Sequence, residues 1–484
     1  MNRVLPPEPF CTLGDYIAHN GGAGLTAARA VSPSTIIDEL VASGLRGRGG
    51  AGFPTGLKWR TVRSFASPLL LTTIVVNAAE GEPGTFKDRA ILRSNPYAVL
   101  EGALIAAHTL NARSIVIATK ATFILEAERV RSALAEMVTA GWCGDVDVAI
   151  VEGPSEYLFG EETALLEVID GRPPFPRIAP PFRRGVVEVV RTHADAASGS
   201  ALAANVQMAG TTGASAAPPV LVNNVETMAN IPAIVARGAA WFRSVGTAES
   251  PGTIVCTVTG AVQRPGVAEV PMGTSLQEAI ELAGGGVQEG QQIGAVMVGV
   301  SSAILTPDLL DTPLTYEAMT AAGSGLGSAG FQVIGDQQEP VSVAAGVARF
   351  LAIESCGQCT NCKQGGMEIA TLLDKITRGD GTRRDVDIIE ARLATVADGA
   401  RCGLASQQLT VVGSLLTTFA EQVNARLEPG CAPGEVFLIA ALLDIDEHGA
   451  VLDTHFTDKQ PDWTYEPVDD SKTPVDRFFD QRAI

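Results

Sequence analysis

Glu354-Ser-Cys-Gly-Gln-Cys-Thr-Asn-Cys-Lys363 is the stretch of this 484-residue chain with the most specific chemistry. Its cysteines, Cys356, Cys359 and Cys362, have C-x-x-C-x-x-C spacing, so their sulfur atoms can converge on one small inorganic group. Such a triplet holds three corners of an iron–sulfur cube and needs one further thiolate. Cys402 is the only other cysteine shortly downstream. The stretch therefore predicts a [4Fe–4S] cluster.

Two other interpretations of these cysteines remain open. Structural zinc also binds four thiolates, but closed zinc sites usually contain two separated C-x-x-C pairs. Buried thiols without a ligand are the third interpretation, which such a dense run of cysteines disfavours. The other four cysteines are scattered along the chain, which fits a reducing compartment better than a disulfide framework.

The charge of the chain restricts its partners. It has 54 acidic and 35 basic side chains, for a net charge of −19. This charge argues against a nucleic-acid or anionic-membrane partner, because the sequence shows no basic footprint that would release counterions. The longest apolar run, residues 103–125, contains His108, Arg113 and Lys120, so no membrane span is expected. The N-terminus lacks the apolar core of a signal peptide, and we expect a cytoplasmic protein.

A glycine-rich loop follows the first helix that the sequence predicts clearly. Ser32 and Pro33 are typical of a helix start, and Gly44 of its end. The loop itself, Arg46-Gly-Arg-Gly-Gly-Ala-Gly-Phe-Pro-Thr-Gly56, contains a G-x-G-x-x-G match. A Rossmann turn must follow a strand, whereas this loop follows a helix, so it is not one.

Glycine at this density still allows backbone N–H groups to approach an anion closely. Arg46, Arg48 and Lys58 add positive charge. We interpret the loop as a phosphate-binding loop, with a flexible surface loop as the alternative.

The next segment alternates between strands and helices. A continuous apolar and β-branched run predicts a strand over 69–77. A helix (96–110), a strand (114–119), a helix (124–139) and a strand (146–151) follow. This alternation predicts an α/β fold with a mostly parallel sheet.

Polar motifs stand at the ends of predicted strands or helices. Asn77, Glu80 and Glu82 follow the first strand, where ligands of open α/β sheets bind, although a solvated acidic turn is equally consistent. Glu161 and Glu162 begin a helix, and helix capping alone explains them. Asn223 and Asn224 provide adjacent amides suited to a polar ring edge.

The remaining segments differ in character. Residues 191–219 are rich in Ala, Gly and Ser, which predicts a flexible insertion. Short strands (253–260 and 267–270) around a helix (275–282) predict a small α+β module. Helical periodicity from 341 to 427 predicts a bundle that holds the cluster. The tail after Gln460 is rich in Asp and Pro with isolated aromatics, and we expect it to become ordered on a partner.

Together these stretches resemble the NADH-binding, 51-kDa flavoprotein subunit of respiratory complex I. The same subunit type occurs in NAD-dependent formate dehydrogenases and NAD-reducing hydrogenases. The resemblance covers residues 32–427 and rests on these motifs: Arg46-Gly-Arg-Gly-Gly-Ala-Gly-Phe-Pro-Thr-Gly-Leu-Lys-Trp59, Asn77-Ala-Ala-Glu-Gly-Glu-Pro-Gly84, Gly160-Glu-Glu-Thr163, Asn223-Asn-Val-Glu-Thr227, Glu354-Ser-Cys-Gly-Gln-Cys359 and Cys402.

The resemblance implies four regions. Residues 1–250 would form an FMN- and NAD(H)-binding α/β domain, interrupted by the insertion 191–219. Residues 251–336 would form a ubiquitin-like (SLBB-type) α+β module, and residues 337–430 a helical [4Fe–4S] domain. Residues 431–484 would be a C-terminal extension that binds a partner or is disordered.

The resemblance also implies the cofactors and their residues. FMN would be held by the glycine loop, and NAD(H) would bind at a site lined by Phe53, Phe182 and the acidic residues Glu80, Glu82 and Glu162. Glu80 would be the catalytic residue. The cofactor-binding residues would be Gly47, Gly49, Gly50, Gly52, Phe53, Lys58, Asn77, Glu80, Glu82, Gly160, Glu161, Glu162, Phe182, Asn223, Asn224 and Thr227. The cluster ligands would be Cys356, Cys359, Cys362 and Cys402.

The implied activity is hydride transfer between NAD(H) and FMN, followed by transfer of single electrons through the cluster to partner subunits. The implied partners are a small [2Fe–2S] subunit of the 24-kDa type and a larger iron–sulfur or molybdenum-containing subunit. The chain would lie in the cytoplasm without inserting into a membrane, as part of the peripheral arm of a membrane-associated complex.

The chain departs from the family pattern at several positions. Ala79 replaces an aspartate, Ala179 a lysine, Phe159 a cysteine and Asn361 a proline. The insertion 191–219 falls beside the expected nucleotide site. A second hypothesis is therefore a paralogue that keeps FMN and the cluster but has an impaired or lost NAD(H) site. A third, a zinc-binding interaction module, is disfavoured by the glycine loop and the paired asparagines.

Overall fold

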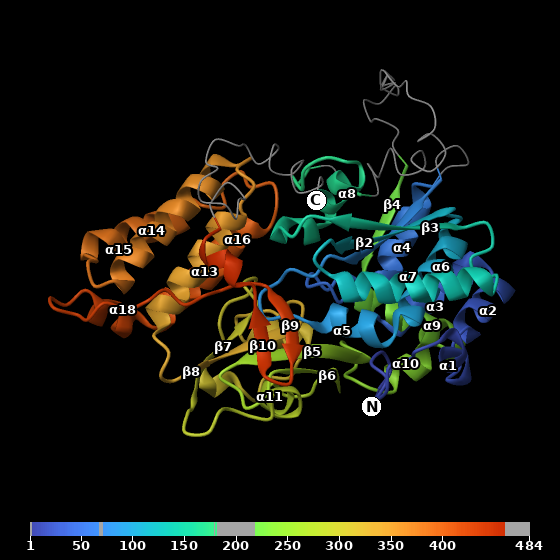
Figure 1. The fold of residues 1–484 in the computed structure, drawn as a ribbon, viewed down its shortest axis with the longest axis horizontal. Helices are drawn as coiled ribbons and strands as arrows, with labels where there is room; N and C mark the ends of the chain where they lie inside the picture. The colour runs from blue at the N-terminus through green and yellow to red at the C-terminus, as the bar shows by residue number, and fades with distance from the viewer. Residues whose placement is uncertain (1, 67–70, 179, 182–217, 460–484) are drawn as a thin grey trace, which may run out of the picture.

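The computed structural model describes residues 2–66, 71–178, 180–181 and 218–459. Three units are arranged around a common centre (Figure 1). An α/β unit contains the N-terminus, a smaller mixed sheet lies below it in the view, and a helical unit lies at the left. The domain boundaries proposed near residues 250, 336 and 430 fall in connections between elements of these units.

The α/β unit is built on a four-stranded parallel sheet in the order β3-β2-β1-β4. The strands are β1 (Thr73–Ala78), β2 (Ser114–Lys120), β3 (Asp147–Gly153) and β4 (Val220–Asn224). Helices α6 (Pro96–Leu110) and α7 (Ile124–Thr139) connect β1 to β2 and β2 to β3. The α/β fold and its parallel sheet are therefore confirmed, and the first residues of the strand expected over 69–77 lie partly outside the described residues.

Both faces of this sheet are covered. Ile74 and Val76 belong to a core that includes α3 (Pro33–Ser43), α6 and α9 (Val225–Arg237). Val75 points to the opposite face, into a smaller core formed with α8 (Glu162–Ile169). A parallel sheet buried on both faces explains the continuous apolar content of its strands.

Shorter helices complete the α/β unit. They are α1 (Leu13–Ala18), α2 (Ala23–Ala30), α4 (Thr55–Ser64), α5 (Lys87–Ser94) and α10 (Ala239–Arg243), and a 3₁₀ turn (Tyr157–Gly160) precedes α8. The glycine-rich loop joins α3 to α4, so the prediction that it follows a helix is confirmed.

The small module is a four-stranded mixed sheet in the order β6-β5-β8-β7. Its strands are β5 (Thr253–Gly260), β6 (Gly266–Pro271), β7 (Ile293–Val298) and β8 (Gly330–Gly335), of which only β5 and β8 pair in parallel. Helix α11 (Leu276–Gly284) packs against β5 and β6, and α12 (Tyr316–Ala321) joins the same core. The predicted α+β module is confirmed.

The helical unit carries the cysteines. Its elements are α13 (Pro340–Glu354), α14 (Gly366–Thr377), α15 (Arg383–Leu393), α16 (Leu404–Gln407), α17 (Gly413–Thr418) and α18 (Ala420–Arg426), with π-helical turns at Asn361–Gly365 and Gln408–Val412. Cys356 and Cys359 lie in the loop after α13, and Cys402 precedes α16. This is the arrangement that the sequence predicts.

The C-terminal extension is ordered against the rest of the chain as far as Lys459. It forms a hairpin of β9 (Leu442–Asp446) and β10 (Gly449–Leu452), and Phe456 is buried in the core of the helical unit. The disordered alternative for 431–484 is therefore wrong for residues 431–459. The predicted partner-binding tail 460–484, and most of the predicted insertion 191–219, lie outside the described residues.

Within the described ranges, no helix has both the length and the apolar character needed to cross a membrane.

Close packing of α6 against α9 generates a stability prediction. A Cβ atom at Gly102 would collide with the backbone carbonyl of Met228. We expect Gly102→Ala to destabilise the protein by about 1–3 kcal/mol, because the two helices must separate. Gly413→Ala is the matched control, since no atom within 4 Å would meet its Cβ. It should be neutral or slightly stabilising. Chemical denaturation followed by circular dichroism measures both, and equal effects of the two variants would contradict this account of α6–α9 packing.

Candidate functional site

A cavity of about 1160 Å³ lies where the three units meet. The glycine loop, the ends of β1 and β4 and the turn before α8 line it from the α/β unit. Residues 301–302 and 316–328 contribute from the mixed sheet, and residues 402–407 from the helical unit. This volume exceeds the range of about 300–1,000 Å³ typical of small-molecule pockets, so a bound cofactor would leave room for a second ligand.

The cavity brings together every predicted cofactor-binding residue that the structure describes. They are Gly47, Gly49, Gly50, Gly52, Phe53, Lys58, Asn77, Glu80, Glu82, Gly160, Glu161, Glu162, Asn223, Asn224 and Thr227. Phe182 and Ala179 lie outside the described residues.

Backbone and ring contacts fix the glycine loop. The Gly47 N–H donates to the carbonyl of Phe53 at 2.8 Å, which closes the loop on itself. The Tyr316 hydroxyl of the mixed-sheet unit donates to the carbonyl of Gly47 at 2.9 Å. Gly52 has a φ of +61°, and a Cβ there would lie 2.5 Å from the Tyr316 ring. Glycine is therefore required at this position both by the backbone conformation and by the available space.

Arg48 has a different role from the one that the sequence predicts. Its side chain is almost fully buried and does not line the cavity. Its backbone N–H donates to the Thr227 hydroxyl at 2.9 Å, and its guanidinium donates to the carbonyl of Thr253 at 3.0 Å and to the Tyr316 hydroxyl at 3.2 Å. The positive charge expected at the loop is therefore used to join the α/β unit to the mixed sheet.

Lys58 is the lysine of the loop region that lines the cavity. Its ammonium lies 2.5 Å from the Glu162 carboxylate, and both side chains remain partly exposed. Glu161 caps α8 by accepting from the backbone N–H groups of Thr163 and Ala164 at 3.0 and 2.8 Å. The capping interpretation thus holds for Glu161, whereas Glu162 is positioned by Lys58.

The asparagines at the strand ends are held in fixed orientations. The indole N–H of Trp59 donates to the Asn223 side chain at 2.9 Å, and the Asn224 amide donates to Asp88 at 2.7 Å. The Asn77 amide donates to the carbonyl of Gly160 at 2.8 Å. These bonds pre-orient the polar wall of the cavity, which reduces the cost of ordering it on a ligand.

Glu80 lies in the acidic turn after β1, and its carboxylate reaches the first turn of α5. It accepts from the backbone N–H groups of Asp88 and Arg89 at 3.2 and 3.4 Å. Burial and the nearby Asp88 carboxylate raise the pKa of Glu80 to about 7. The carboxyl group can therefore gain or lose a proton near neutral pH, which is a property of catalytic and ligand-sensing groups.

Glu82 joins the three units. One carboxylate oxygen accepts from the Tyr157 hydroxyl at 2.5 Å, and the other accepts from the backbone N–H of Val300 in the mixed-sheet unit at 2.7 Å. The Tyr157 hydroxyl in turn accepts from the Gln407 amide of the helical unit at 2.9 Å. Burial raises the pKa of Glu82. Glu82 is therefore part of the cavity wall and of the junction between the units.

Sequence reasoning missed several residues of this site. Tyr157, Gln407 and Tyr316 line the cavity, and none belongs to a motif recognised in the sequence. Lys87, whose ammonium lies 2.7 Å from Asp88 and 3.0 Å from Glu226, was also missed. A lysine followed directly by an aspartate, close behind the acidic turn, is the signal that could have indicated it.

The four predicted ligand cysteines line a second, much smaller cavity of about 10 Å³. Burial raises the pKa of Cys362, and burial also raises the pKa of Cys402 to about 12. These thiols would ionise readily only on binding a positively charged centre, as metal ligation provides. Among the described residues no three Cys, His, Asp or Glu side chains are close enough to hold a single metal ion.

The two cavities share a wall. Leu158, Cys402 and Leu404 border both the large cavity and the cysteine cavity. A ligand in the large cavity would therefore be separated from the cysteine cavity by a single layer of side chains, to which Cys402 itself belongs.

Two departures from the family pattern are accommodated by packing. Ala79 is 1% exposed and belongs to the smaller core of the sheet while also bordering the cavity. Phe159 is fully buried in the same core, and its ring would collide with a Cβ at Gly153. Neither substitution disturbs the fold.

Three family models match the chain. The Nuo51 FMN-binding domain matches residues 40–233, the SLBB domain residues 255–301, and the NADH-ubiquinone oxidoreductase-F iron-sulfur binding region residues 342–426. These ranges correspond to the α/β, mixed-sheet and helical units.

Curated proteins and solved structures are similar over most of the chain. The HndC subunit of the NADP-reducing hydrogenase of Solidesulfovibrio fructosivorans is 35% identical, over 90% of this chain and 84% of its own length. The F 2 subunit of NADH-quinone oxidoreductase from Rhizobium meliloti (strain 1021) is 34% identical, over 86% and 95%. The crystal structure of an NAD⁺-reducing [NiFe]-hydrogenase in the H₂-reduced state matches with a TM-score of 0.72 and 31% identity, covering 88% of this chain and 68% of that chain.

The contact between Gly52 and Tyr316 generates a test of the glycine loop. We expect Gly52→Ala to weaken binding of FMN, the ligand that the family model of this region names, by about five- to hundredfold, because the methyl group forces Tyr316 off the loop. Gly144→Ala is matched in backbone strain, with a φ of +56°, but its Cβ would meet no atom within 4 Å. Fluorescence titration of the flavin-stripped variants measures the affinities. Equal losses in both variants would contradict the role of the Tyr316 contact, because Gly144 does not border the cavity.

Proposed function

Because the chain belongs to the family of flavoprotein subunits that includes the F subunits of NADH-quinone oxidoreductases, we propose that its cavity carries out electron transfer between NAD(H), FMN and a [4Fe–4S] cluster. The chain is an oxidoreductase subunit of the NADH dehydrogenase type. The observation that carries the proposal is the shared wall: Cys402 borders both the cavity of the glycine loop and the cavity of the four cysteines.

The described residues fit the expected cofactors. We propose that the glycine loop, Lys58, Asn77, Asn223, Asn224 and Thr227 hold FMN. They combine backbone N–H groups that a ligand can approach closely, two cations at the cavity wall (Arg46 and Lys58) and amides held in fixed orientations. When bound, FMN supplies the exchange between a hydride and single electrons. The protein contributes orientation and exclusion of water.

The dinucleotide would enter beside Phe53. This ring is 55% exposed at the cavity wall, so it offers an aromatic face for stacking of adenine. We propose that Glu80, Glu82, Glu162 and Phe182 complete the NAD(H) site. Glu80 would hold a proton at the acidic turn near neutral pH and so limit the negative charge that an anionic dinucleotide meets.

The cluster would be held by Cys356, Cys359, Cys362 and Cys402. Groups around them donate to the sulfur atoms: the Gln358 amide lies 3.5 Å from the Cys356 sulfur, and the Ser355 hydroxyl lies 3.2 Å from that of Cys362. Hydrogen bonds to ligand sulfurs tune the reduction potential of such clusters.

The relatives are named as subunits of enzymes, which supports a proposal about partners and location. We propose that electrons leave toward a small [2Fe–2S] subunit of the 24-kDa type and from there to a larger iron–sulfur or molybdenum-containing subunit. We propose a cytoplasmic location in the peripheral arm of such a complex.

Anaerobic titration with NADH tests the proposed function. We expect NADH to bleach the flavin absorbance of the purified holoprotein. Loss of the lysine at Ala179 removes one charge-assisted contact, worth about 1.5–3 kcal/mol, so binding should be roughly ten- to hundredfold weaker than in a relative with that lysine. If millimolar NADH leaves the flavin oxidised while dithionite reduces it, the paralogue hypothesis holds instead. Ala79→Asp with Ala179→Lys is then the variant that should restore the reaction.

Glu80 generates a prediction of pH dependence. Its pKa of about 7 means that a proton is lost as the pH rises through neutrality, which leaves an extra negative charge beside an anionic dinucleotide. The dissociation constant of NADH should therefore increase across this range, by at most about tenfold per pH unit, because a single proton is linked. Glu80→Gln, which cannot ionise, should bind with little pH dependence and more tightly than the wild type at pH 8.

Equilibrium binding between pH 5.5 and 8.5 measures this effect. Glu249→Gln is the control, since it removes another carboxylate that borders the cavity. It should retain the pH dependence. A Glu80→Gln variant whose binding still weakens with rising pH would contradict the role of Glu80.

A further inference from the structure

The C-terminal extension runs along helix α13 of the helical unit and reaches the α/β unit. The Gly434 N–H donates to the carbonyl of Thr377 at 2.9 Å, and the Phe437 N–H donates to the carbonyl of Ser342 at 3.2 Å. A Cβ at Gly346 of α13 would collide with the backbone carbonyl of Phe437. The extension is therefore packed against α13 closely enough to require a glycine.

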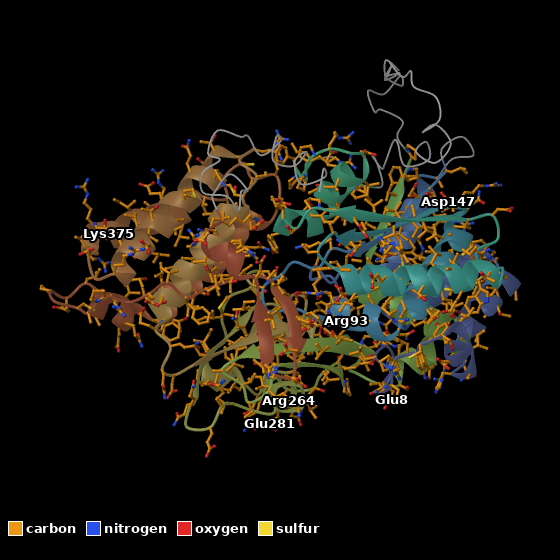
Figure 2. The ribbon with its side chains drawn as sticks, viewed as in Figure 1. Glu8, Arg93, Asp147, Arg264, Glu281 and Lys375 are labelled. Atoms are coloured by element: carbon orange, nitrogen blue, oxygen red, sulfur yellow. The ribbon has the colours of Figure 1, made fainter. Side chains whose placement is uncertain are left out.

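The hairpin of the extension also contacts α5 of the α/β unit. Arg93, which Figure 2 labels beside the hairpin, forms an ion pair with Asp444 at 2.8 Å. The Arg89 guanidinium donates to the carbonyl of Leu442 at 3.0 Å. Beyond the hairpin, the ring centroid of Phe456 lies 4.9 Å from that of Phe350 in α13. The extension thus bridges two of the three units.

This segment ends, within the described residues, on a buried ion pair. The Lys459 ammonium lies 2.6 Å from the Glu354 carboxylate, and the two side chains are 1% and 3% exposed. The second oxygen of Glu354 accepts the backbone N–H of Tyr157 at 2.8 Å. A buried carboxylate is costly without a partner, so the ammonium of Lys459 stabilises the Glu354 side chain in this position.

Glu354 places this ion pair between the cysteine loop and the wall of the large cavity. Glu354 is the last residue of α13, two residues before Cys356, and Tyr157 belongs to the wall of the large cavity. The carboxylate therefore connects the cysteine loop to the backbone of the wall that separates it from the cavity. Lys120, Lys363 and Glu156 are further charged groups near the pair. Lys120 donates to the carbonyl of Ser155 at 2.9 Å, and Lys363 donates to the carbonyl of Ser355 at 2.9 Å.

We propose that Lys459 is a positioning residue for the cluster: by neutralising Glu354 it fixes the cysteine loop against Tyr157 and keeps the local charge favourable to the reduced cluster. This inference rests on the proposed electron-transfer function. Replacing Lys459 by a neutral residue would leave the negative charge of Glu354 beside a group that gains an electron, and that electron would be less stable.

Variants of the full-length holoprotein test the proposal. Lys459→Met should lower the equilibrium constant for one-electron reduction of the cluster at least about tenfold, which corresponds to about 59 mV. Lys459→Arg should remain within about twofold of the wild type, because it preserves the charge. The double variant Lys459→Met with Glu354→Gln should recover at least half of the shift, since it removes the uncompensated carboxylate.

The matched control is Lys375→Met. Lys375 forms an ion pair with Asp385 at 2.8 Å in the same helical unit, but it is 41% exposed and lies on α14 away from the hairpin (Figure 2). Its loss should leave the potential unchanged, because exposed pairs contribute little.

The readout is a dithionite titration of the cluster followed by EPR, with iron content measured in parallel. It does not use NADH, so a failed nicotinamide site and a failed role of Lys459 are distinguishable. Wild-type potential and iron content in Lys459→Met would overturn the proposal, as would an equal shift in Lys375→Met. If Lys459→Met does not accumulate as a folded protein, the double variant Lys459→Met with Glu354→Gln decides. Accumulation of the double variant with its cluster bound supports the proposal, and its failure to accumulate with a cluster overturns the proposal.

Discussion

The hydrogen bonds of the Glu82 carboxylate are the constraint on which the arrangement of the site depends. Glu82 extends from the acidic turn after β1 and accepts from Tyr157 and from the backbone of Val300. Since Gln407 donates to the same Tyr157 hydroxyl, one carboxylate links all three units. A Cβ at Gly299 would collide with this carboxylate. The wall of the cavity is therefore assembled by the packing of the units on one another, and no unit contains the complete site.

Buried charges hold the opposite side of the cavity. Lys87, Asp88 and Glu226 form ion pairs of 2.7 and 3.0 Å behind the strand ends, and Arg48 joins them by bonds to the mixed sheet. Such groups are costly to bury unless each has a partner. Two of them find a partner in the mixed sheet: Arg48 donates to the carbonyl of Thr253, and Glu226 accepts from the backbone N–H of Val255 at 2.9 Å, so these bonds require one relative position of the two units. The same logic applies at Lys459 and Glu354 beside the cysteine loop. Buried polar contacts thus hold the cavity wall and the cysteine loop in the positions that electron transfer between them needs.

The sequence predicts individual helices, strands and motifs well, and it predicts the contacts between the three units poorly. The helix over 96–110 has the predicted bounds because Asn95 caps it, Pro96 begins it, and Asn111 can adopt the left-handed conformation that ends it. The cysteine spacing and the polar strand ends likewise act over short distances, so they indicate the cluster and a ligand site, while the individual cofactor-binding residues follow from the family resemblance. Tyr157 and Gln407 are 250 residues apart and meet only in the folded chain. The sequence places Arg48 at the loop's anion site because it does not reveal that the side chain turns toward β5. The order of residues 431–459 is not predicted because it depends on packing against α13 and α5, not on a core of its own.

The central claim is that electrons pass from the large cavity to the cysteine site within this one chain. Rapid-freeze EPR after mixing the isolated holoprotein with NADH tests this claim most directly. The account predicts that the signal of a reduced [4Fe–4S] cluster develops without any partner subunit. In Cys402→Ser, NADH should still bleach the flavin while that signal is absent or altered. A wild-type protein in which NADH bleaches the flavin and dithionite reduces the cluster, but NADH never does, would contradict the account.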